Sequence, residues 1–151
     1  ELLDIVNDED MVIDRQTRML VHQLGLQHRG VHVFLFTQDG KMLVQKRTAD
    51  RAASPSMLDC SVSEHVKAGE SYLDAAVRGM KEEMGVDGIE IKPLIRFRMN
   101  YGVNDNEIST ILYLYTFYKF SHYQILQWVY GTRSYHQNRK FGSWICPCKF
   151  Y

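Results

Sequence analysis

Short apolar segments separated by turn-forming residues follow one another through the first 118 residues. Asp39-Gly40 stands between two of them, and Asp-Gly in that position is the strongest short-range signal of a β-hairpin. Asn7 and the three acidic residues after it separate two more segments and predict an N-terminal hairpin. The segments with strand composition are Asp4–Val6, Met11–Ile13, Val31–Phe36, Met42–Lys46, Met57–Val62, Ile89–Phe97 and Thr110–Phe120.

One segment, Ser71–Met84, has helical periodicity. Its apolar positions recur three or four residues apart, as on the buried side of an amphipathic helix. Ser71 and Asp74 predict an N-terminal capping box, and Gly85 predicts the end of the helix. Gly79 lies in the interior, where glycine costs about 1 kcal/mol relative to alanine. The polar side of this helix carries Arg78, Glu82 and Glu83.

Charge is balanced over the whole chain but unevenly placed along it. The 151 residues contain 18 basic and 18 acidic side chains, so the formal net charge is zero. All 18 acids lie in residues 1–118 with 13 of the bases (net −5), and residues 119–151 carry five bases and no acid. We therefore expect a first domain over residues 1–120 and a divergent basic tail over 121–151, packed or partly disordered.

Length and composition are those of an ordinary globular domain. No apolar run approaches the roughly 20 residues that span a bilayer, so no membrane role is expected. The N-terminal stretch lacks the basic and apolar regions of a secretory signal, and three cysteines do not make a disulfide framework. A cytoplasmic location follows as an expectation. A few dispersed charges in the tail do not make a basic stripe, so nucleic-acid binding is not favoured.

The stretch SEHVKAGESYLDAAVRGMKEEMGV, Ser63 to Val86, resembles the Nudix box, G-x5-E-x7-R-E-U-x-E-E-x-G-U with U apolar. The resemblance implies an α/β fold, an α/β/α sandwich with a mixed central sheet and, here, an N-terminal hairpin. Five of the seven fixed letters and both apolar positions are present, namely Glu70, Arg78, Glu82, Glu83 and Gly85, with Met80 and Val86.

The spacing of the acidic residues has a physical reason of its own. Glu82 and Glu83 lie one turn beyond Arg78, and Glu70 lies just before the helix begins. Carboxylates are the ligands that Mg²⁺ and Mn²⁺ prefer, usually together with substrate phosphates. Arg78 is expected to orient the carboxylates. We expect Mg²⁺ (or Mn²⁺) as cofactor, with Glu70, Glu82, Glu83 and Glu107 as metal ligands and Arg78, Glu82, Glu83 and Glu107 as catalytic residues.

The same function needs basic groups for the phosphates. Lys46 and Arg47 end the second strand of the predicted Asp-Gly hairpin and Arg51 lies in the loop after it, and these three are candidates for substrate binding, together with His65. For the three basic residues, surface solubility remains an equal alternative. The expected substrate is a small nucleoside diphosphate-linked (or related diphosphate) compound, cleaved by metal-activated water. A homodimer is compatible with the sequence.

Residues 3 to about 118 also resemble the isopentenyl-diphosphate isomerase-like branch of the Nudix superfamily. In the isomerases, histidines and acidic residues hold a metal. The matching positions here are His28, with His22 a looser match, then His65, Glu83 and the Asp105/Glu107 pair. The cysteine acid/base of the isomerases is replaced by Ser63, which argues against isomerase activity because a hydroxyl cannot replace a tunable thiol. Alternation along the segment predicts that Cys60 points away from Ser63 into the core.

Two departures from the box bear on catalysis. Glu64 stands in place of the first glycine, in what we expect to be a loop, and Gly79 stands in place of the glutamate after the arginine. Loss of a positioned base typically costs about 10²–10⁴ in rate. Glu107 or Asp105 is the first candidate to compensate, and Glu64 the second. The alternative is a weakened module that binds without turnover, in which case Gly79→Glu is expected to restore activity.

Overall fold

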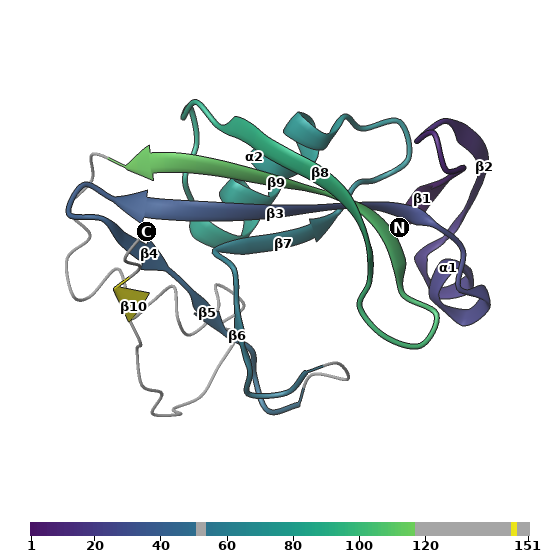
Figure 1. The fold of residues 1–151 in the computed structure, drawn as a ribbon, viewed down its shortest axis with the longest axis horizontal. Helices are drawn as coiled ribbons and strands as arrows, with labels where there is room; N and C mark the ends of the chain where they lie inside the picture. Colours follow the sequence, from purple (N-terminus) through teal and green to yellow (C-terminus); the bar gives the residue numbers. More distant parts are fainter. Residues whose placement is uncertain (51–53, 117–145, 148–151) are drawn as a thin grey trace.

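The computed structural model describes residues 1–50, 54–116 and 146–147. Figure 1 shows a long central sheet with one helix lying across a face of it and a small hairpin-and-helix unit at one end. The elements are β1 (Leu2–Val6), β2 (Val12–Thr17), α1 (Arg18–Leu24), β3 (His28–Thr37), β4 (Lys41–Leu43), β5 (Gln45–Lys46), β6 (Leu58–Asp59), β7 (Val62–His65), α2 (Tyr72–Met84), β8 (Lys92–Asn100), β9 (Asn106–Thr116) and β10 (Cys146–Pro147). Most of the tail predicted over 121–151 lies outside the described residues.

The central sheet is mixed. Its order is β10-β4-β3-β9-β8, and β7 pairs with the first half of β3. Strands β3 and β9 run parallel over ten residue pairs, from His28 opposite Glu107 onward, whereas the other pairings are antiparallel. The α/β architecture, the mixed sheet and the N-terminal hairpin are therefore confirmed.

Alternation along β3 separates two faces of the sheet. Val31, Val33 and Leu35 are fully buried against α2, where Ala75, Ala76 and Met80 complete the core. The alternate positions, beginning with His28, Gly30 and His32, belong to the opposite face. Since side chains alternate with a period of two, one strand thus supplies the core on one face and the two histidines on the other.

Helix α2 has the ends that its sequence predicts. Ser71 accepts a hydrogen bond from the backbone N–H of Asp74, and the Asp74 carboxylate accepts one from the Ser71 N–H. Gly85 ends the helix in the left-handed conformation, with φ of 64°. This capping box fixes where the helix starts, and therefore where Glu70, Arg78 and Glu83 lie relative to the sheet.

The segment around Cys60 differs from the prediction of one strand over Met57–Val62. It is divided into β6 and β7 because Ser61 is buried, accepting a hydrogen bond from the Leu35 N–H and donating one to the Leu43 carbonyl. Glu64, expected in a loop, lies in β7 opposite Val31. The expectation that Cys60 and Ser63 point apart was wrong, because the strand is interrupted between them and both side chains approach His32.

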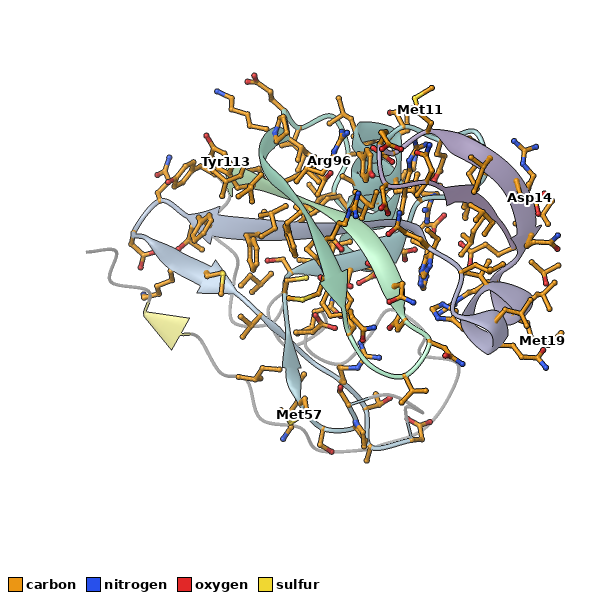
Figure 2. All side chains as sticks on the ribbon, turned by 45° about the vertical axis from the view of Figure 1, so that its right-hand side comes forward. Met11, Asp14, Met19, Met57, Arg96 and Tyr113 are labelled. Atoms are coloured by element: carbon orange, nitrogen blue, oxygen red, sulfur yellow. The ribbon has the colours of Figure 1, made fainter. Side chains whose placement is uncertain are left out.

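The N-terminal hairpin lies at one end of the sheet. Figure 2 shows Met11 and Asp14 on this hairpin and Met19 on α1 at the periphery, and all three side chains are exposed. No helix within the described ranges is long and apolar enough to cross a membrane.

Candidate metal-binding active site

Two clusters of ionisable side chains lie on opposite sides of β7. Glu64 faces α2 with its neighbours Val62 and Val66, whereas His65 faces Glu107. The first, the box cluster, consists of Glu64, Glu70, Arg78, Glu82 and Glu83. The second, the histidine cluster, consists of His22, His28, His65, Asp105 and Glu107.

Arg78 is the centre of the box cluster. Its Nε donates to Glu70 Oε1 at 2.8 Å, and its Nη2 donates to Glu70 Oε2 at 3.1 Å and to the backbone carbonyl of His65 at 2.8 Å. Its Nη1 reaches Glu64 Oε2 at 3.1 Å and Glu82 Oε2 at 3.4 Å. One guanidinium therefore holds three carboxylates at fixed positions, as its planar fork of donors allows.

The same contacts set the ionisation of Glu70. Burial alone would raise the pKa of this carboxyl, but the hydrogen bonds from Arg78 and from the Lys67 N–H outweigh it and lower the pKa. Glu70 is thus held as a carboxylate at neutral pH.

Glu83 has the opposite environment. Burial, together with the neighbouring Glu64 carboxyl, raises the pKa of Glu83 to about 8, although the Gln45 side chain donates to Glu83 Oε2 at 2.5 Å and opposes the rise. Two carboxyls that share one site cannot both ionise easily without a cation. A divalent cation removes this conflict, and an all-oxygen donor set fits Mg²⁺ or Mn²⁺.

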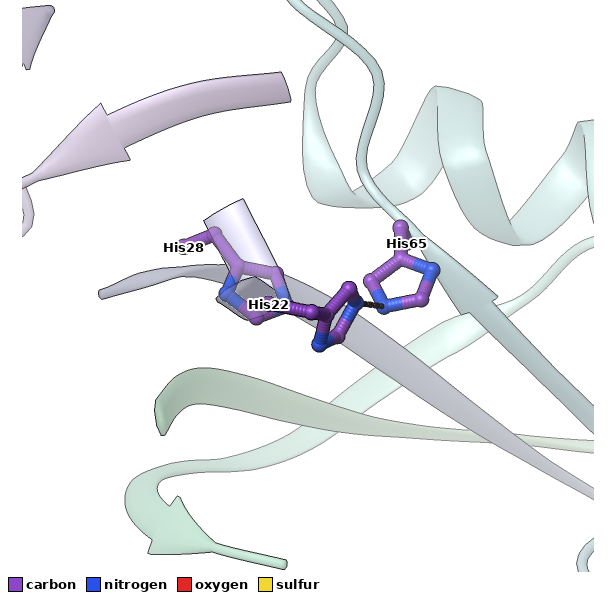
Figure 3. Close-up of side chains that lie close together, drawn as sticks. All are labelled: His22, His28 and His65. Carbon is purple, nitrogen blue, oxygen red and sulfur yellow. Dashed lines mark hydrogen bonds between the residues drawn. The ribbon is translucent and has the colours of Figure 1, made fainter. Parts of the chain in front are cut away.

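The histidine cluster brings three elements together. His22 comes from α1, His28 from the start of β3 and His65 from the end of β7, and Figure 3 shows the three rings converging. His22 Nε2 and His65 Nε2 are 3.2 Å apart, and one ligand atom from each ring lies within 4.8 Å of the others. Asp105 and Glu107 approach the same rings from the start of β9.

Buried atoms of this cluster lack hydrogen-bond partners of good geometry. His28 Nδ1 donates to the Leu26 carbonyl at 3.0 Å, and its Nε2 lies 3.5 Å from Glu107 Oε1. Nε2 of His28 and Oδ1 of Asp105 are both buried without a hydrogen bond. Such atoms are costly unless a ligand satisfies them, and imidazoles with carboxylates suit Zn²⁺, Mn²⁺ or Fe²⁺. The residues present therefore fit a transition-metal ion.

Ionisation within the histidine cluster follows burial and mutual contact. Burial lowers the pKa of His65 to about 3 and, aided by the nearby His28, lowers that of His22. For Glu107, burial opposes ionisation, but contacts with His28 and His65 prevail and lower the pKa. For His28, burial lowers the pKa, but contact with Glu107 and the hydrogen bond to the Leu26 carbonyl prevail and raise it. Neutral His22 and His65 beside an ionised Glu107 are the protonation states that a metal requires, and a bound cation would displace the proton that Glu107 favours on His28.

Gly30 makes the position of Glu107 possible. A Cβ at Gly30 would lie 2.0 Å from Glu107 Oε2 and 2.8 Å from Cδ, so the carboxyl occupies the space over the backbone of β3. Glu107 also accepts a hydrogen bond from Ser109 Oγ at 2.9 Å. The parallel register of β3 and β9 therefore places this carboxylate where the histidines meet.

Beside this cluster lies a chain of polar contacts centred on His32. Ser63 Oγ is 3.2 Å and Cys60 Sγ 3.7 Å from His32 Nδ1, and the Tyr101 hydroxyl is 2.8 Å from Nε2. Burial raises the pKa of the Cys60 thiol, so this sulfur is not an ionised nucleophile. Of the two groups at His32 Nδ1, the Ser63 hydroxyl is nearer than the Cys60 sulfur.

The structure gives little support for substrate binding by the predicted basic residues. Lys46 ends β5, and Arg47 follows it and forms an ion pair of 2.7 Å with Asp59 on the neighbouring strand β6. Arg51 lies outside the described residues. Of the predicted site residues, Glu70, Glu82, Glu83 and Arg78 thus come together, whereas Glu107 and His65 belong to the histidine cluster on the other side of β7.

Sequence reasoning gave His22 only a loose match and missed Gln45 and Tyr101. His22 sits on a seven-residue helix and meets His65 only through the tertiary fold, since 43 positions separate them in the chain. Gln45 contacts Glu83 across 38 positions. No local spacing could indicate either pairing.

Comparison with known proteins defines the class to which this fold and acidic helix belong. The NUDIX domain family model matches residues 26–141. An uncharacterized Nudix hydrolase of Streptomyces coelicolor is 39% identical over 101 residues, covering 67% of this chain and 55% of that protein. The crystal structure of DR0079 from Deinococcus radiodurans superimposes with a TM-score of 0.65 at 27% identity, covering 77% of this chain and 72% of that one.

The chain belongs to the Nudix family. It is also 39% identical over 85 residues to an isopentenyl-diphosphate Delta-isomerase of Serratia proteamaculans, covering 56% of this chain and 48% of that protein. The chain spans about half the length of the curated relatives it matches.

Proposed function

We propose that this protein is a metal-dependent hydrolase that cleaves a small compound containing a diphosphate. The observation that carries the proposal is the box cluster, in which Arg78 holds Glu64, Glu70 and Glu82 beside a partly buried Glu83. Membership of the Nudix family and the carboxylate oxygens of the box cluster both support metal-dependent cleavage of a diphosphate.

The residues of the box cluster have different roles in the proposed reaction. Glu70, Glu82 and Glu83 provide the oxygens that would hold Mg²⁺ or Mn²⁺, and Arg78 fixes their spacing through charge-assisted hydrogen bonds. When bound, the cation neutralises phosphate charge and lowers the pKa of a water molecule. Gln45 fixes the orientation of the Glu83 carboxyl through its amide.

The histidine cluster supplies a second set of ligands. We propose that His22, His28, His65, Asp105 and Glu107 hold a transition-metal ion, so that Glu107, expected from sequence beside the box glutamates, serves a separate metal. The supporting observations are the unsatisfied atoms of His28 and Asp105. The protein would then use two kinds of cation, one in an oxygen site and one in a nitrogen-rich site.

The test is a direct activity measurement. Purified protein is incubated with Mg²⁺ or Mn²⁺ and a panel of nucleoside diphosphate derivatives, and released phosphate or monophosphate is quantified. We expect turnover with at least one compound, and Glu83→Gln should reduce it by at least roughly 10²-fold because it removes a metal ligand. Activity that survives Glu83→Gln would contradict the assignment, and binding without turnover would indicate a binding module.

Isomerisation of an isoprenoid diphosphate is a second candidate, because the histidine cluster occupies positions that resemble the isomerase metal site. Ser63 and the buried, un-ionised Cys60 beside His32 argue against it. Incubation with isopentenyl diphosphate, followed by NMR of the products, tests for isomerisation. Formation of the allylic isomer would place this reaction above hydrolysis.

A further inference from the structure

Gly79 and Glu64 are packed against each other across the gap between α2 and β7. A Cβ added at Gly79 would lie 2.9 Å from Glu64 Cγ and 2.6 Å from Val62 Cγ1, distances too short for any side chain. The methylene stem of Glu64 therefore passes directly over the helix backbone at the one interior position that has no side chain. This close approach explains why α2 carries a glycine in its interior.

The carboxyl at the end of that stem joins the box cluster. Glu64 Oε2 is 3.1 Å from Arg78 Nη1, and the Glu64 side chain is 21% exposed. The Glu64 carboxyl also hydrogen-bonds that of Glu83. A charged residue on the strand face that packs against a helix is normally unfavourable, since burial of an unpaired charge costs several kcal/mol. Here Arg78 and the space above Gly79 make it tolerable.

We propose that Glu64 supplies the metal-binding carboxylate that the Nudix box otherwise carries at the position of Gly79. The two positions have exchanged residue types: the box has glycine on the strand and glutamate on the helix, whereas this chain has glutamate on the strand and glycine on the helix. The inference rests on the proposed function, because it assigns a further ligand to the same cation.

Packing explains why the exchange involves both positions. The space between β7 and α2 admits one side chain, because the stem of Glu64 already occupies the volume that a Cβ at position 79 would need. A glutamate from either side would carry its carboxylate into the region between Arg78 and Glu83. Gly79→Glu alone, expected from sequence to restore activity if the protein is a weakened module, is therefore expected to disrupt the helix–strand contact instead.

A purely structural role for Glu64 is the competing explanation. Arg78 already has two bonds to Glu70 and one to the His65 carbonyl, so loss of the Glu64 contact leaves it well held. Glu64→Gln keeps the stem and an oxygen acceptor for Arg78 but removes the charge. A structural Glu64 tolerates this change, whereas a metal ligand does not.

The experiment compares Glu64→Gln, Gly79→Glu and the double variant Glu64→Gly/Gly79→Glu with the wild-type chain. Mg²⁺ is the cation used, because this hard cation prefers carboxylate oxygens to histidine nitrogens. Its affinity for each protein is measured by calorimetry with Mg²⁺ alone. Thermal unfolding and diphosphate turnover are measured in parallel. Glu90→Gln, whose parent side chain is 81% exposed, is the matched control and should behave as wild type.

We expect Glu64→Gln to weaken Mg²⁺ binding at least tenfold with little change in unfolding temperature. Gly79→Glu should lower the unfolding temperature, and the double variant should recover both the unfolding temperature and the Mg²⁺ affinity to within about threefold of wild type. The proposal would be overturned if Glu64→Gln bound Mg²⁺ as tightly as the wild type. It would also be overturned if the double variant had an Mg²⁺ affinity and an unfolding temperature no higher than those of the weaker single variant. Wild-type protein that binds Mg²⁺ but hydrolyses no diphosphate contradicts the proposed function, while the affinities still decide the role of Glu64.

Discussion

Two glycines each make room for a glutamate that belongs to a candidate metal site. Gly30 on β3 leaves space for the Glu107 carboxyl, and Gly79 on α2 leaves space for the Glu64 stem. Neither glycine has the positive φ that usually explains a glycine in a regular element. Their role is close approach, which an isolated sequence cannot reveal because the other residue comes from a distant segment.

Replacing Gly30 by alanine should disable the histidine cluster. The added Cβ would lie within 3 Å of Oε2 and Cδ of Glu107. The Glu107 carboxylate must therefore move away from His28 and His65. We expect Zn²⁺ affinity, measured by competition with a chelating dye, to fall roughly 10- to 100-fold, as for disturbed metal surroundings generally.

The matched control for this change is Gly102→Ala. A Cβ at Gly102 meets no atom within 4 Å, so the added methyl group should leave Zn²⁺ affinity unchanged. Equal affinities for Gly30→Ala and Gly102→Ala would mean that Glu107 is not a ligand of this ion.

At the scale of elements, Asp10 fastens the N-terminal hairpin to the domain. Its carboxylate accepts hydrogen bonds from Arg29 Nε at 2.6 Å, from the Tyr72 hydroxyl at 3.1 Å and from Arg96 at 2.8 Å. Figure 2 shows Arg96 beside the hairpin. One residue in the turn between β1 and β2 thus connects β3, α2 and β8. The start of α2, which follows Glu70, and the start of β3, which carries His28 and His32, are held by the same carboxylate.

Asp10→Asn should loosen this connection. Asn tolerates the left-handed backbone of this position, where φ is 62°, so the change tests the charge and not the turn. We expect the free energy of unfolding in urea to fall by about 1–3 kcal/mol, because charge-assisted hydrogen bonds at a largely buried site are lost. Asp8→Asn is the control, since its side chain is 70% exposed and pairs only at the surface with Arg98.

A change of less than about 0.5 kcal/mol for Asp10→Asn, equal to that expected of the exposed Asp8 variant, would show that the Asp10 charge does not hold the hairpin on the domain. Leu3 and Ile5 of β1 and Val21 of α1 form a small core within the N-terminal unit, and the Gly69 N–H also donates to the Asp4 carboxylate.

At the scale of the whole molecule, the raised pKa of Glu83 connects folding stability to pH and to metal. In the unfolded chain this carboxyl loses its proton near its ordinary pKa of 4.5, whereas in the folded protein it keeps the proton up to about 8. The unfolded state therefore binds fewer protons across that interval. Stability contributed by the protonated group is lost as pH rises from 4.5 to 8.

We predict that the metal-free wild type loses about 1–2 kcal/mol more stability than Glu83→Gln between pH 6.5 and 8. Other titrating groups are common to both proteins, so the difference isolates Glu83. The measurement is urea unfolding with a chelator present, and Mg²⁺ should abolish the difference in slope. Parallel curves for the two proteins would mean that Glu83 is ionised throughout.

The sequence by itself determined the elements whose signals are local. The capping box of α2, the glycine at its end, the Asp-Gly hairpin and the grouping of Glu70, Arg78 and Glu82 all follow from residues within about twelve positions of one another. Helical periodicity fixes such neighbours whatever the rest of the chain does, which is why the box cluster could be predicted nearly whole.

The sequence left two groupings open for Glu107, with the box glutamates or with the histidines, and only the tertiary structure decided between them. Glu107 lies with the histidines because the parallel register of β3 and β9 places it opposite His28, where Gly30 leaves room for its carboxyl. Glu64 faces α2 because it lies within β7, which ends at His65. The buried Ser61 separates this strand from β6 and so fixes where β7 begins. A shift of one residue in a strand reverses the face of every side chain, so these assignments depend on pairings between segments that local sequence does not encode.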